Sequence, residues 1–310
     1  MKKLFTIAIP TRNRDRYLIE TIDSIIKQDG FDDIEIVICN NSDEKASIIK
    51  KKYIDYENIK YYENDKVLTI DENMIKVGSL ANTKYFLWLG DDDFIIDGGI
   101  KSILTLVTNY EYDFILLNAM FVTENLDKKL GNTIRINKNL TYHSPKEFFT
   151  AHCFHMPFGT LIIKKELFDL VLEENKRFEG TSHAYSGLVF DYLAKSNLIN
   201  KQNNIIVISE ELIQLRQIPK TWKNNTTKIM FQEIPEWFLL LNDFYKDETS
   251  KILTNYLTNQ FKIKNLLIHR LKSQLSVSNF TNNTKYASFL QKIKYCIVGL
   301  IPIFRTKVNK

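Results

Sequence analysis

The sequence has few residues of the types that build cross-linked or unstructured proteins. Its 310 residues include only three cysteines, Cys39, Cys153 and Cys296, which lie far apart and form no Cys-x-x-Cys pair. Neither a disulfide framework nor a cysteine zinc site is therefore indicated, and a reducing compartment is the simplest interpretation. With ten glycines and six prolines, the chain also offers no sign of a long disordered linker.

Long apolar runs are missing as well. Nowhere do about 18 uncharged apolar residues follow one another, so we predict no transmembrane helix. The N-terminus, MKKLFTIAIPTRNRD, is basic and then apolar, like a short signal peptide. However, its apolar run ends at Pro10 and no small-residue cleavage site follows. We interpret this segment as the first strand of a folded domain.

Acidic residues are absent from the last fifth of the chain. Residues 249–310 contain 11 lysines and arginines and no aspartate or glutamate. The net charge of +5 therefore divides into +11 there and −6 over residues 1–248. An acidic body with a purely basic tail is typical of a catalytic domain joined to a surface-binding element.

The first hundred residues alternate between two periodicities. Short apolar runs of the β type occupy residues 4–10, 34–39, 59–63 and 84–89. Helical spacing separates them: one helix follows Arg14, a second is expected to be capped by Ser42 or Asp43, and a third lies around 70–80. This alternation predicts an α/β fold in which a parallel sheet is covered by helices on both faces.

The second half has a less regular pattern. We expect strands at 112–122 and at 133–136, a helix from Pro145 with Ser144 as its cap, and a strand running into a helix over 158–168. A helix over 185–195 and one or two closing strands over 203–216 complete this half, and the chain beyond about 220 is almost wholly helical. We predict one domain over residues 1–218, with halves at 1–100 and 101–218, and a helical, basic region over 219–310.

Polar clusters follow three of the predicted strands, at residues 11–14, 40–43 and 91–93. The carboxyl ends of parallel strands meet at one edge of a sheet, which is where α/β proteins bind ligands. The third cluster is three aspartates in a row, Asp91, Asp92 and Asp93. Adjacent carboxylates suit a divalent cation, because Mg²⁺ and Mn²⁺ prefer hard oxygen ligands. The alternative is a solvated acidic turn, which an isolated Asp triplet would favour.

These motifs resemble the family 2 glycosyltransferases, enzymes that use nucleotide-diphospho-sugars and have the GT-A fold. The resemblance rests on IAIPTRNR, IVICNNSDE and ANTKYFLWLGDDDFI, which occur in that order. It is good over about residues 3–100, looser to about 215 and absent beyond. It implies a GT-A-type, mostly parallel sheet between helices, with a Rossmann-like nucleotide half and a C-terminal helical extension.

The resemblance assigns roles to the residues after the first two strands. Pro10, Thr11 and Arg14 would flank the nucleotide base and the diphosphate. Asn40 stands where the family usually has an aspartate that contacts the base, so the chain departs from the family there, although an amide still suits uracil or thymine. Ser42 belongs to the same turn.

The remaining donor-site roles fall on the third helix and on the aspartates. Asn73 matches a family asparagine on the helix before the fourth strand. Asp91 would bind the ribose, and Asp92, together with Asp93, would hold Mn²⁺ or Mg²⁺ against the diphosphate. A bound cation would offset the negative charge that builds on the departing nucleoside diphosphate.

Inverting members also need a base that takes a proton from the acceptor hydroxyl. The family often supplies it from a Glu-Asp pair, which is absent from the corresponding stretch RFEGTSHAYSGLVFDYLAK. This stretch offers His183 in the loop, Asp191 within the helix and, behind these two, Glu179.

The C-terminal region is predicted to bind a membrane surface. YCIVGLIPIF (295–304) is too short to span a bilayer, contains Pro302 and has lysines and arginine on both sides, so we expect it to lie in the interface on anionic headgroups. The alternative is that these helices pack on the catalytic domain and the lysines are only solvated. No nucleic-acid-binding module is recognisable.

We therefore predict a metal-dependent, inverting glycosyltransferase that is cytoplasmic and associated peripherally with the inner face of the plasma membrane. Its partners would be a nucleotide-sugar donor, with UDP favoured, and a glycan or lipid-linked saccharide acceptor in the synthesis of a surface polysaccharide. The alternative is a catalytically silent assembly subunit of the same fold that binds a sugar nucleotide or a glycan. Asn40 and the missing Glu-Asp pair keep that alternative open.

Overall fold

The structure is a computed structural model that describes residues 3–43, 47–181, 183–200, 202–218, 226–271, 275 and 277–300. The chain forms two compact units. The first unit contains residues 1–179 and 185–218, and the second contains residues 180–184 and 219–310. The short segment 180–184 therefore belongs with the C-terminal helices, although the sequence places it between elements of the first unit.

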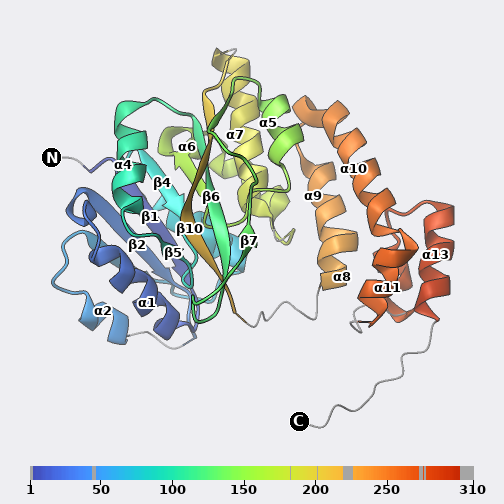
Figure 1. Cartoon of the computed structure of the whole chain (residues 1–310), viewed down its shortest axis with the longest axis horizontal. Coiled ribbons are helices and arrows are strands. Elements are labelled where there is room, and N and C mark those ends of the chain that lie inside the picture. Colours follow the sequence, from blue (N-terminus) through green and yellow to red (C-terminus); the bar gives the residue numbers. More distant parts are fainter. Residues whose placement is uncertain are drawn as a thin grey trace, which may run out of the picture. The chain divides into compact units, whose positions relative to one another are not determined.

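The strands of the first unit form one sheet, in the order β3-β2-β1-β4-β9-β6-β10-β5, with β7 beside β6 and β8 beside β10 (Figure 1). Their bounds are β1 (Phe5–Thr11), β2 (Ile34–Asn40), β3 (Ile59–Glu63), β4 (Tyr85–Trp88), β5 (Phe94–Ile95), β6 (Phe114–Thr123), β7 (Lys129–Asn132), β8 (Leu140–Tyr142), β9 (Leu161–Lys164) and β10 (Ile205–Gln217).

The first four strands are the four apolar runs predicted from the sequence, and β3, β2, β1 and β4 lie parallel in that order. Beyond β4 the sheet becomes mixed. Strand β9 runs antiparallel between β4 and β6, and β10 is parallel to β6. The predicted α/β class is confirmed, with parallel pairing concentrated in the N-terminal half.

Helices cover both faces of the sheet (Figure 1). On one face, apolar side chains of α1 (Asp15–Ile26), α2 (Ser47–Lys52) and α4 (Gly99–Asn109) share a buried core with β1 and β2. On the other face, Phe168 packs edge-on against Phe86 and Trp88, with ring centroids 5.2 and 5.7 Å apart. The helices of that face are α3 (Ile70–Ser79), α5 (Pro145–His152), α6 (Lys165–Val171) and α7 (Ala184–Asn200).

Helix α5 starts as the sequence predicts. The Ser144 side chain accepts a hydrogen bond from the backbone N–H of Glu147, and Pro145 occupies the first helical turn. Ser42 and Asp43, the predicted caps of α2, both bond to Asn13, after β1, and so join two strand ends. Residues 44–46, which separate them from α2, lie outside the described residues, and the capping role stays a prediction.

The strand expected at 133–136 is wrong, because the strand that pairs with β6 is β7, residues 129–132. At Ile134 the backbone N–H donates to the side-chain Oδ1 of Asn118 on β6, at 3.1 Å, instead of to a backbone carbonyl of that strand. The β-rich composition of TIRI gave no sign that a side chain 16 residues away would take this bond.

The second unit is helical, as predicted for the chain beyond about residue 220. Its helices are α8 (Thr226–Lys228), α9 (Ile234–Leu240), α10 (Lys246–Gln260), α11 (Ile263–Leu271), α12 (Phe280–Asn283) and α13 (Phe289–Gly299). A π-helical turn, Ile229–Glu233, joins α8 to α9 just before Pro235. Proline lacks the N–H that would continue the ladder and crowds the preceding turn, which accounts for the wider turn there.

This unit has a core of its own, made of Phe231, Phe261, Leu266, Leu275, Tyr295 and Val298. Two of these, Tyr295 and Val298, belong to the segment 295–304 that we expected to lie in a membrane interface. Their burial corrects that expectation for these two residues, whereas Ile297 and Leu300 of the same segment are exposed, and residues 301–304 lie outside the described residues. In the described part of the chain, no helix has the length and apolarity to cross a bilayer.

Candidate functional site

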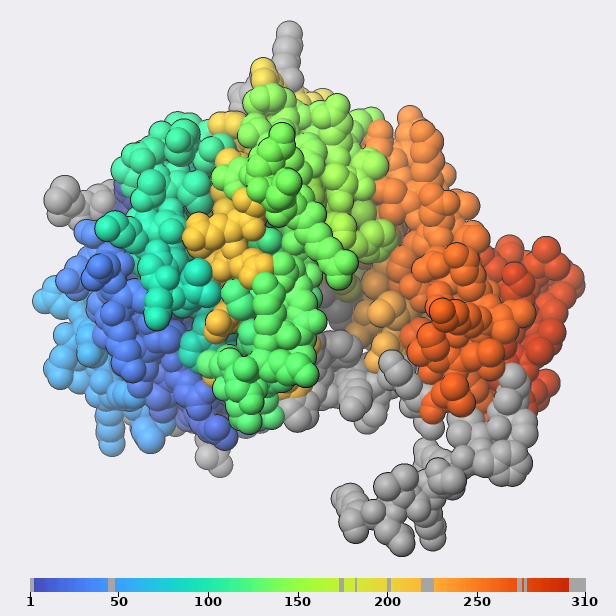
Figure 2. Space-filling model, viewed as in Figure 1, coloured from blue at the N-terminus to red at the C-terminus, as the bar shows by residue number. Residues whose placement is uncertain are grey.

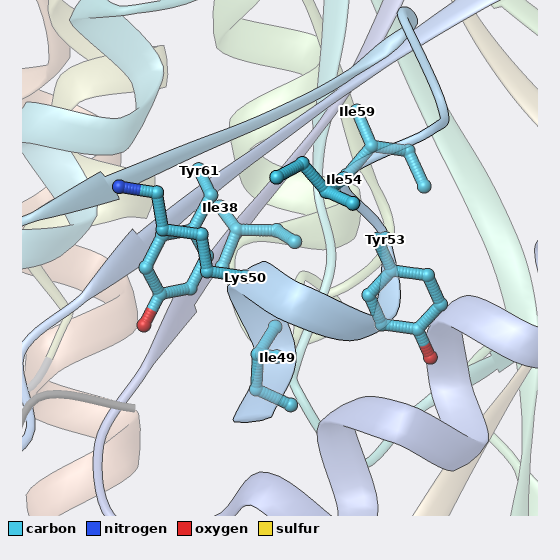
Figure 3. Close-up of a pocket in the computed structure, with 7 residues that line it drawn as sticks. All are labelled: Ile38, Ile49, Lys50, Tyr53, Ile54, Ile59 and Tyr61. Carbon is cyan, nitrogen blue, oxygen red and sulfur yellow. The ribbon is translucent and has the colours of Figure 1, made fainter. Parts of the chain in front are cut away.

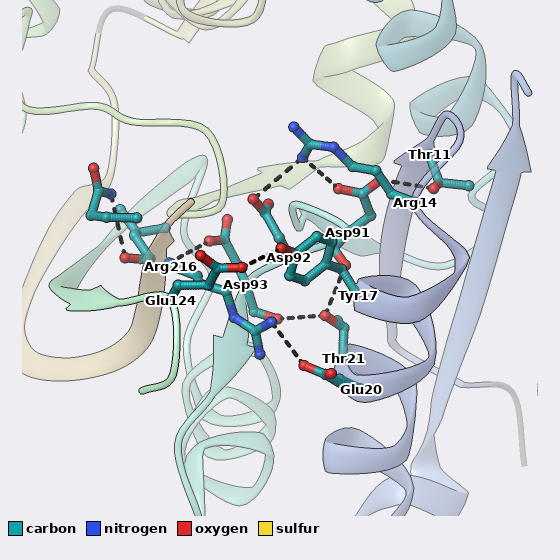
Figure 4. Close-up of polar contacts among 12 residues, drawn as sticks. Thr11, Arg14, Tyr17, Glu20, Thr21, Asp91, Asp92, Asp93, Glu124 and Arg216 are labelled. Carbon is teal, nitrogen blue, oxygen red and sulfur yellow. Dashed lines mark hydrogen bonds and ion pairs between the residues drawn. The ribbon is translucent and has the colours of Figure 1, made fainter. Parts of the chain in front are cut away.

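The first aspartate of the triplet lies against the end of β1. Strands β1 and β4 are parallel neighbours, so the turns that follow them meet. The Thr11 hydroxyl donates to Asp91 Oδ2 at 2.7 Å, and Arg14 Nη1 donates to Asp91 Oδ1 at 3.1 Å (Figure 4). The same Arg14 nitrogen lies 3.3 Å from Asp92 Oδ2. One guanidinium thus holds two carboxylates together, as the predicted convergence of strand ends requires.

Burial governs the charge of Asp91, which is only 6% exposed. Burial raises the pKa of its carboxyl group to about 6, and the carboxylate of Asp92 contributes to the rise, while Arg14 and the Thr11 hydroxyl oppose it. Near neutral pH, Asp91 is therefore ionised although it is buried, and Arg14 and the Thr11 hydroxyl stabilise its carboxylate.

Asp92 is the more accessible of the pair, with 15% of its side chain exposed. Arg14, at 33%, is also partly open to solvent. Because a ligand can reach both groups, they form the part of the site that can meet a diphosphate and a cation.

Asp93 makes a different set of contacts. Its Oδ1 accepts the backbone N–H of Arg216, at the end of β10, at 3.0 Å. The backbone of Gly159 lies close on the other side, so that a Cβ added there would be 3.1 Å from Asp93 Oδ2. These contacts support a structural role for Asp93, which ties the aspartate turn to the last strand of the sheet.

Thr21, on α1, fixes the backbone of the same turn. Its hydroxyl lies 3.0 Å from the carbonyl oxygens of both Asp91 and Asp93, and its side chain is fully buried (Figure 4). The sequence analysis did not identify Thr21, because its position on α1 is that of an ordinary core-facing residue.

Arg216 was also missed. Its buried guanidinium pairs with Glu20 on α1 at 2.8 Å and stacks between the rings of Tyr17 and Phe94, 5.1 and 4.6 Å from their centroids. Tyr17 in turn donates to Glu124 at 2.7 Å, beyond β6 (Figure 4). The aspartate turn is thus connected to α1, β10 and the end of β6.

After β2, the predicted base-contacting residues bond to one another. Asn40 is buried, and its Oδ1 accepts both the backbone N–H and the hydroxyl of Ser42, at 3.0 and 2.6 Å. The Ser42 Oγ accepts the Asn13 backbone N–H at 2.7 Å. Pro10, at the end of β1, is partly buried beside β2. The turns after β1 and β2 therefore form one hydrogen-bonded rim.

Asn73 lies behind this rim rather than on its surface. Its side-chain amide donates to the Cys39 carbonyl at 3.2 Å and accepts from Asn64 at 2.9 Å, and Asn64 also donates to Asn41. With 4% exposure, Asn73 has the geometry of a support that fixes the end of β2 on α3.

The candidate bases lie in different units. Asp191 is buried in α7, in the first unit, where its carboxylate pairs with Arg177. His183 belongs to the second unit, where its Nδ1 lies 3.0 Å from the Thr181 carbonyl and its ring 6.2 Å from that of Trp237. Glu179 is an exposed residue at the end of the first segment of the first unit.

Two hollows of the first unit lie on other elements. One hollow has a volume of about 160 Å³ and lies between α2 and the sheet. In Figure 3, the amine of its lysine and the hydroxyls of its tyrosines point away from the isoleucines. Its lining is Ile38, Ile49, Lys50, Tyr53, Ile54, Ile59 and Tyr61. The other, of about 560 Å³, includes Asn118, Arg135 and Glu211, and Figure 2 shows β10, in gold, reaching the surface beside the green β6–β8 segment. The first has the apolar lining of a packing space, and the second is polar and open.

The oxygen ligands at the aspartate turn suit a divalent cation. Among the described residues, no cluster of three or more His, Cys, Asp or Glu side chains could hold a metal by itself. Mg²⁺ is commonly bound by one or two carboxylates together with substrate phosphates, so a single accessible carboxylate beside Arg14 fits a cation that arrives with a diphosphate. Asp92 meets this requirement, and Asp93 is turned toward Arg216.

Known proteins resemble this chain in sequence and in fold. A minor teichoic acid biosynthesis protein, GgaB, of Bacillus subtilis is 24% identical over 305 residues, which are 94% of this chain and 32% of that protein. A GalNAc(5)-diNAcBac-PP-undecaprenol beta-1,3-glucosyltransferase of Campylobacter jejuni is 31% identical over 184 residues, 57% of this chain and 55% of that protein. The chain thus spans about a third and about half of these relatives' lengths.

The fold is similar to that of S. aureus TarS. The crystal structure of TarS residues 1–349 in complex with UDP-GlcNAc superposes with a TM-score of 0.61 at 14% identity, covering 96% of this chain and 79% of that one. Residues 6–171, just over half of the chain, match the family described as "Glycosyl transferase family 2". That match includes the turns after β1, β2 and β4, and the chain belongs to glycosyl transferase family 2.

Proposed function

We propose that this chain transfers a sugar from a nucleoside-diphosphate sugar, with UDP as the favoured nucleotide, to a hydroxyl of a glycan or lipid-linked saccharide. The observation that carries the proposal is the meeting of Thr11, Arg14, Asp91 and Asp92 at adjacent strand ends. The TarS structure with UDP-GlcNAc supports a nucleotide-sugar donor, because it shares this fold.

The relatives suggest where such a transfer takes place. One is named for teichoic acid biosynthesis and another for transfer to an undecaprenol-linked saccharide. We therefore propose a role in the synthesis of a surface polysaccharide, at the inner face of the cytoplasmic membrane, where a lipid-linked acceptor would be available.

Within the donor site, the residues have separate tasks. Asp91 would accept a hydrogen bond from a ribose hydroxyl. Arg14 would turn from the carboxylates toward the diphosphate, because its positive charge is complementary to that group. Asp92 would hold Mn²⁺ or Mg²⁺, which when bound offsets the charge developing on the leaving diphosphate. Asp93 and Asn73 would position these groups from behind.

The proton acceptor is proposed from sequence position and local chemistry. The Nδ1–H of His183 points at the Thr181 carbonyl, which makes Nε2 the basic nitrogen of the ring. Asp191 is buried, and its carboxylate is engaged in an ion pair with Arg177. We therefore place His183 first and Asp191 second, and we propose inversion at the anomeric carbon.

The test is a panel of nucleotide sugars offered to the purified protein with and without Mn²⁺. We expect one donor to raise the melting temperature only with the cation, and to be hydrolysed or transferred. Asp92→Asn should abolish transfer and keep the fold, and Asp97→Asn, an exposed carboxylate of the same segment, is the matched control. Full activity of Asp92→Asn would refute the metal assignment, and wild-type protein that binds donors without turnover would identify a silent subunit.

The base and the stereochemistry need separate measurements. We expect His183→Gln to lower kcat at least a hundredfold with unchanged donor affinity, because general base catalysis contributes roughly 10²–10⁴-fold. Asp191→Asn, which removes a partner of Arg177, should act mainly on stability. NMR of the first product should show the anomeric configuration opposite to that of the donor, and retention would contradict the inverting assignment.

A further inference from the structure

Helix α13 of the second unit has two different apolar faces. Its inner face contributes Tyr295 and Val298 to the core, and the Tyr295 hydroxyl accepts the side-chain amide of Asn283 at 2.8 Å. Its outer face carries large apolar side chains that are 40–76% exposed. These are Phe289, Leu290, Ile293, Ile297 and Leu300. The core of the unit therefore accounts for only one of the two faces.

The exposed side chains form one continuous stripe. At about 100° per residue, the five positions fall within an arc of roughly 100°, and the core residues lie on the opposite side. We call this stripe the outer face of α13. Lys294 borders it on the side of Leu290, and Lys292 borders it on the side of Phe289. The geometry is that of an amphipathic helix that presents an apolar stripe with one lysine on each side.

Charge in the surrounding chain is of the same sign. Residues 249–310 contain 11 basic residues and no acidic one. An apolar stripe of this kind on a soluble surface marks an interaction site. Its lysine borders are complementary to a partner that is apolar in the centre and negative around it, as an anionic lipid headgroup layer over acyl chains is.

We infer that the outer face of α13 is the surface through which this protein binds an anionic lipid bilayer. The inference rests on the proposed function for its purpose, because a lipid-linked acceptor lies at such a surface. A second copy of the chain fits less well: pairing two outer faces would bring Lys292 and Lys294 against their own copies, and helix α13 contains no carboxylate to neutralise them.

The outer face of α13 is better tested by single substitutions than by a truncation. Removing the end of the chain would take Tyr295 and Val298 out of the core and so unfold the unit. Single substitutions on the outer face avoid this problem. Ile297→Asp places a negative charge in the middle of the stripe, and Leu239→Asp makes the same kind of change at an exposed apolar residue of α9.

The experiment is flotation of the full chain with vesicles of phosphatidylcholine and phosphatidylglycerol, and with vesicles of phosphatidylcholine alone. We expect the wild type to float with the anionic vesicles and at least tenfold less with the neutral ones. Ile297→Asp should lower the partition coefficient at least tenfold, and Leu239→Asp should leave it within twofold. Circular dichroism and melting temperature confirm that both variants are folded.

Three results would overturn the inference: Ile297→Asp floats like the wild type, the wild type does not bind anionic vesicles, or Ile297→Asp converts a stable dimer into monomers. Donor hydrolysis in solution, measured on the same samples, separates the inference from the proposed function. If Ile297→Asp no longer floats with the vesicles but still hydrolyses the donor, the result supports the outer face of α13 as the binding surface. Flotation without hydrolysis in the wild type would leave the surface supported and the proposed activity refuted.

Discussion

Removing the Thr21 hydroxyl is the sharpest test of how the aspartate turn is held in place. The hydroxyl is fully buried and lies 3.0 Å from the carbonyl oxygens of Asp91 and Asp93. Thr21→Val keeps the shape of the side chain and removes the hydroxyl. The two carbonyls then share no side-chain donor from α1, and the turn loses one of its links to that helix.

The expected cost follows from the burial of these groups. Leaving a buried acceptor without its donor costs about 1–3 kcal/mol. For a unit of about 200 residues, each kcal/mol lowers the melting temperature by roughly 2–4 °C. A turn free to shift also misplaces Asp91 and Asp92, and displacements of about 1 Å at a reacting centre can cost on the order of a hundredfold in rate. We therefore expect kcat/KM to fall at least tenfold.

Calorimetry and steady-state transfer assays would measure both effects. Thr21→Ser keeps the hydroxyl and should retain most of the kcat/KM, although it loses a buried methyl group. Thr105→Val is a second control, because the Thr105 hydroxyl bonds only locally to the Lys101 carbonyl on an exposed part of α4. If Thr21→Val is as stable and as active as Thr105→Val, the link from α1 does not position the turn.

Two further predictions concern charge and space in the same turn. Because burial raises the pKa of Asp91 to about 6 from an ordinary 3.8, ionising it disfavours the folded state, and stability should fall as the pH rises from about 4 to 6. Urea unfolding of the wild type against Asp91→Asn should show a difference on the order of 2–3 kcal/mol growing over that range, and parallel curves would contradict it. Gly159→Ala meets a positive φ of 95° and Asp93 Oδ2 at 3.1 Å, whereas Gly98→Ala meets a φ of 77° and open space. Both should lose about 1–2 kcal/mol from backbone strain, and only Gly159→Ala should also lower kcat/KM; equal activity would remove the Gly159 contact from the site.

The N-terminal half of the fold was predictable because its signals are local. The apolar runs of β1, β2, β3 and β4 form strands close to the expected residues, since continuous β-rich segments bounded by polar turns have few alternatives. The meeting of Thr11, Arg14 and Asp91 was predictable for a related reason. Once adjacent strands are parallel, the turns at their carboxyl ends meet.

The supports of the site could not be predicted, because they join residues that are distant in sequence. Asp93 and Arg216 are 123 positions apart, and no periodicity connects them. Thr21 occupies a helix position that looks like any core-facing one. Asn73 was assigned to the nucleotide from its place in a motif, whereas its amide groups bond to Cys39 and Asn64.

The C-terminal helices show a second limit of sequence reasoning. The run 295–304 is the most apolar part of the tail, so it was the expected membrane contact. In the structure, Tyr295 and Val298 face the core of the second unit. Hydrophobicity alone cannot separate an apolar residue that packs inside a unit from one that faces outward. Exposure in the folded unit points instead to the outer face of α13 as the proposed membrane contact, and this face includes Ile297 and Leu300 of the same run.

The bond between Asp93 and Arg216 determines how much of the chain the aspartate turn needs. The match to the family ends at residue 171, yet the backbone N–H that holds the third aspartate belongs to residue 216. Strand β10 also lies inside the sheet, between β6 and β5. The segment that the family model matches is therefore shorter than the segment that builds the sheet. A protein shortened to residues 6–171 would keep the turns after β1, β2 and β4 and would lose the strand to which the aspartate turn is bonded.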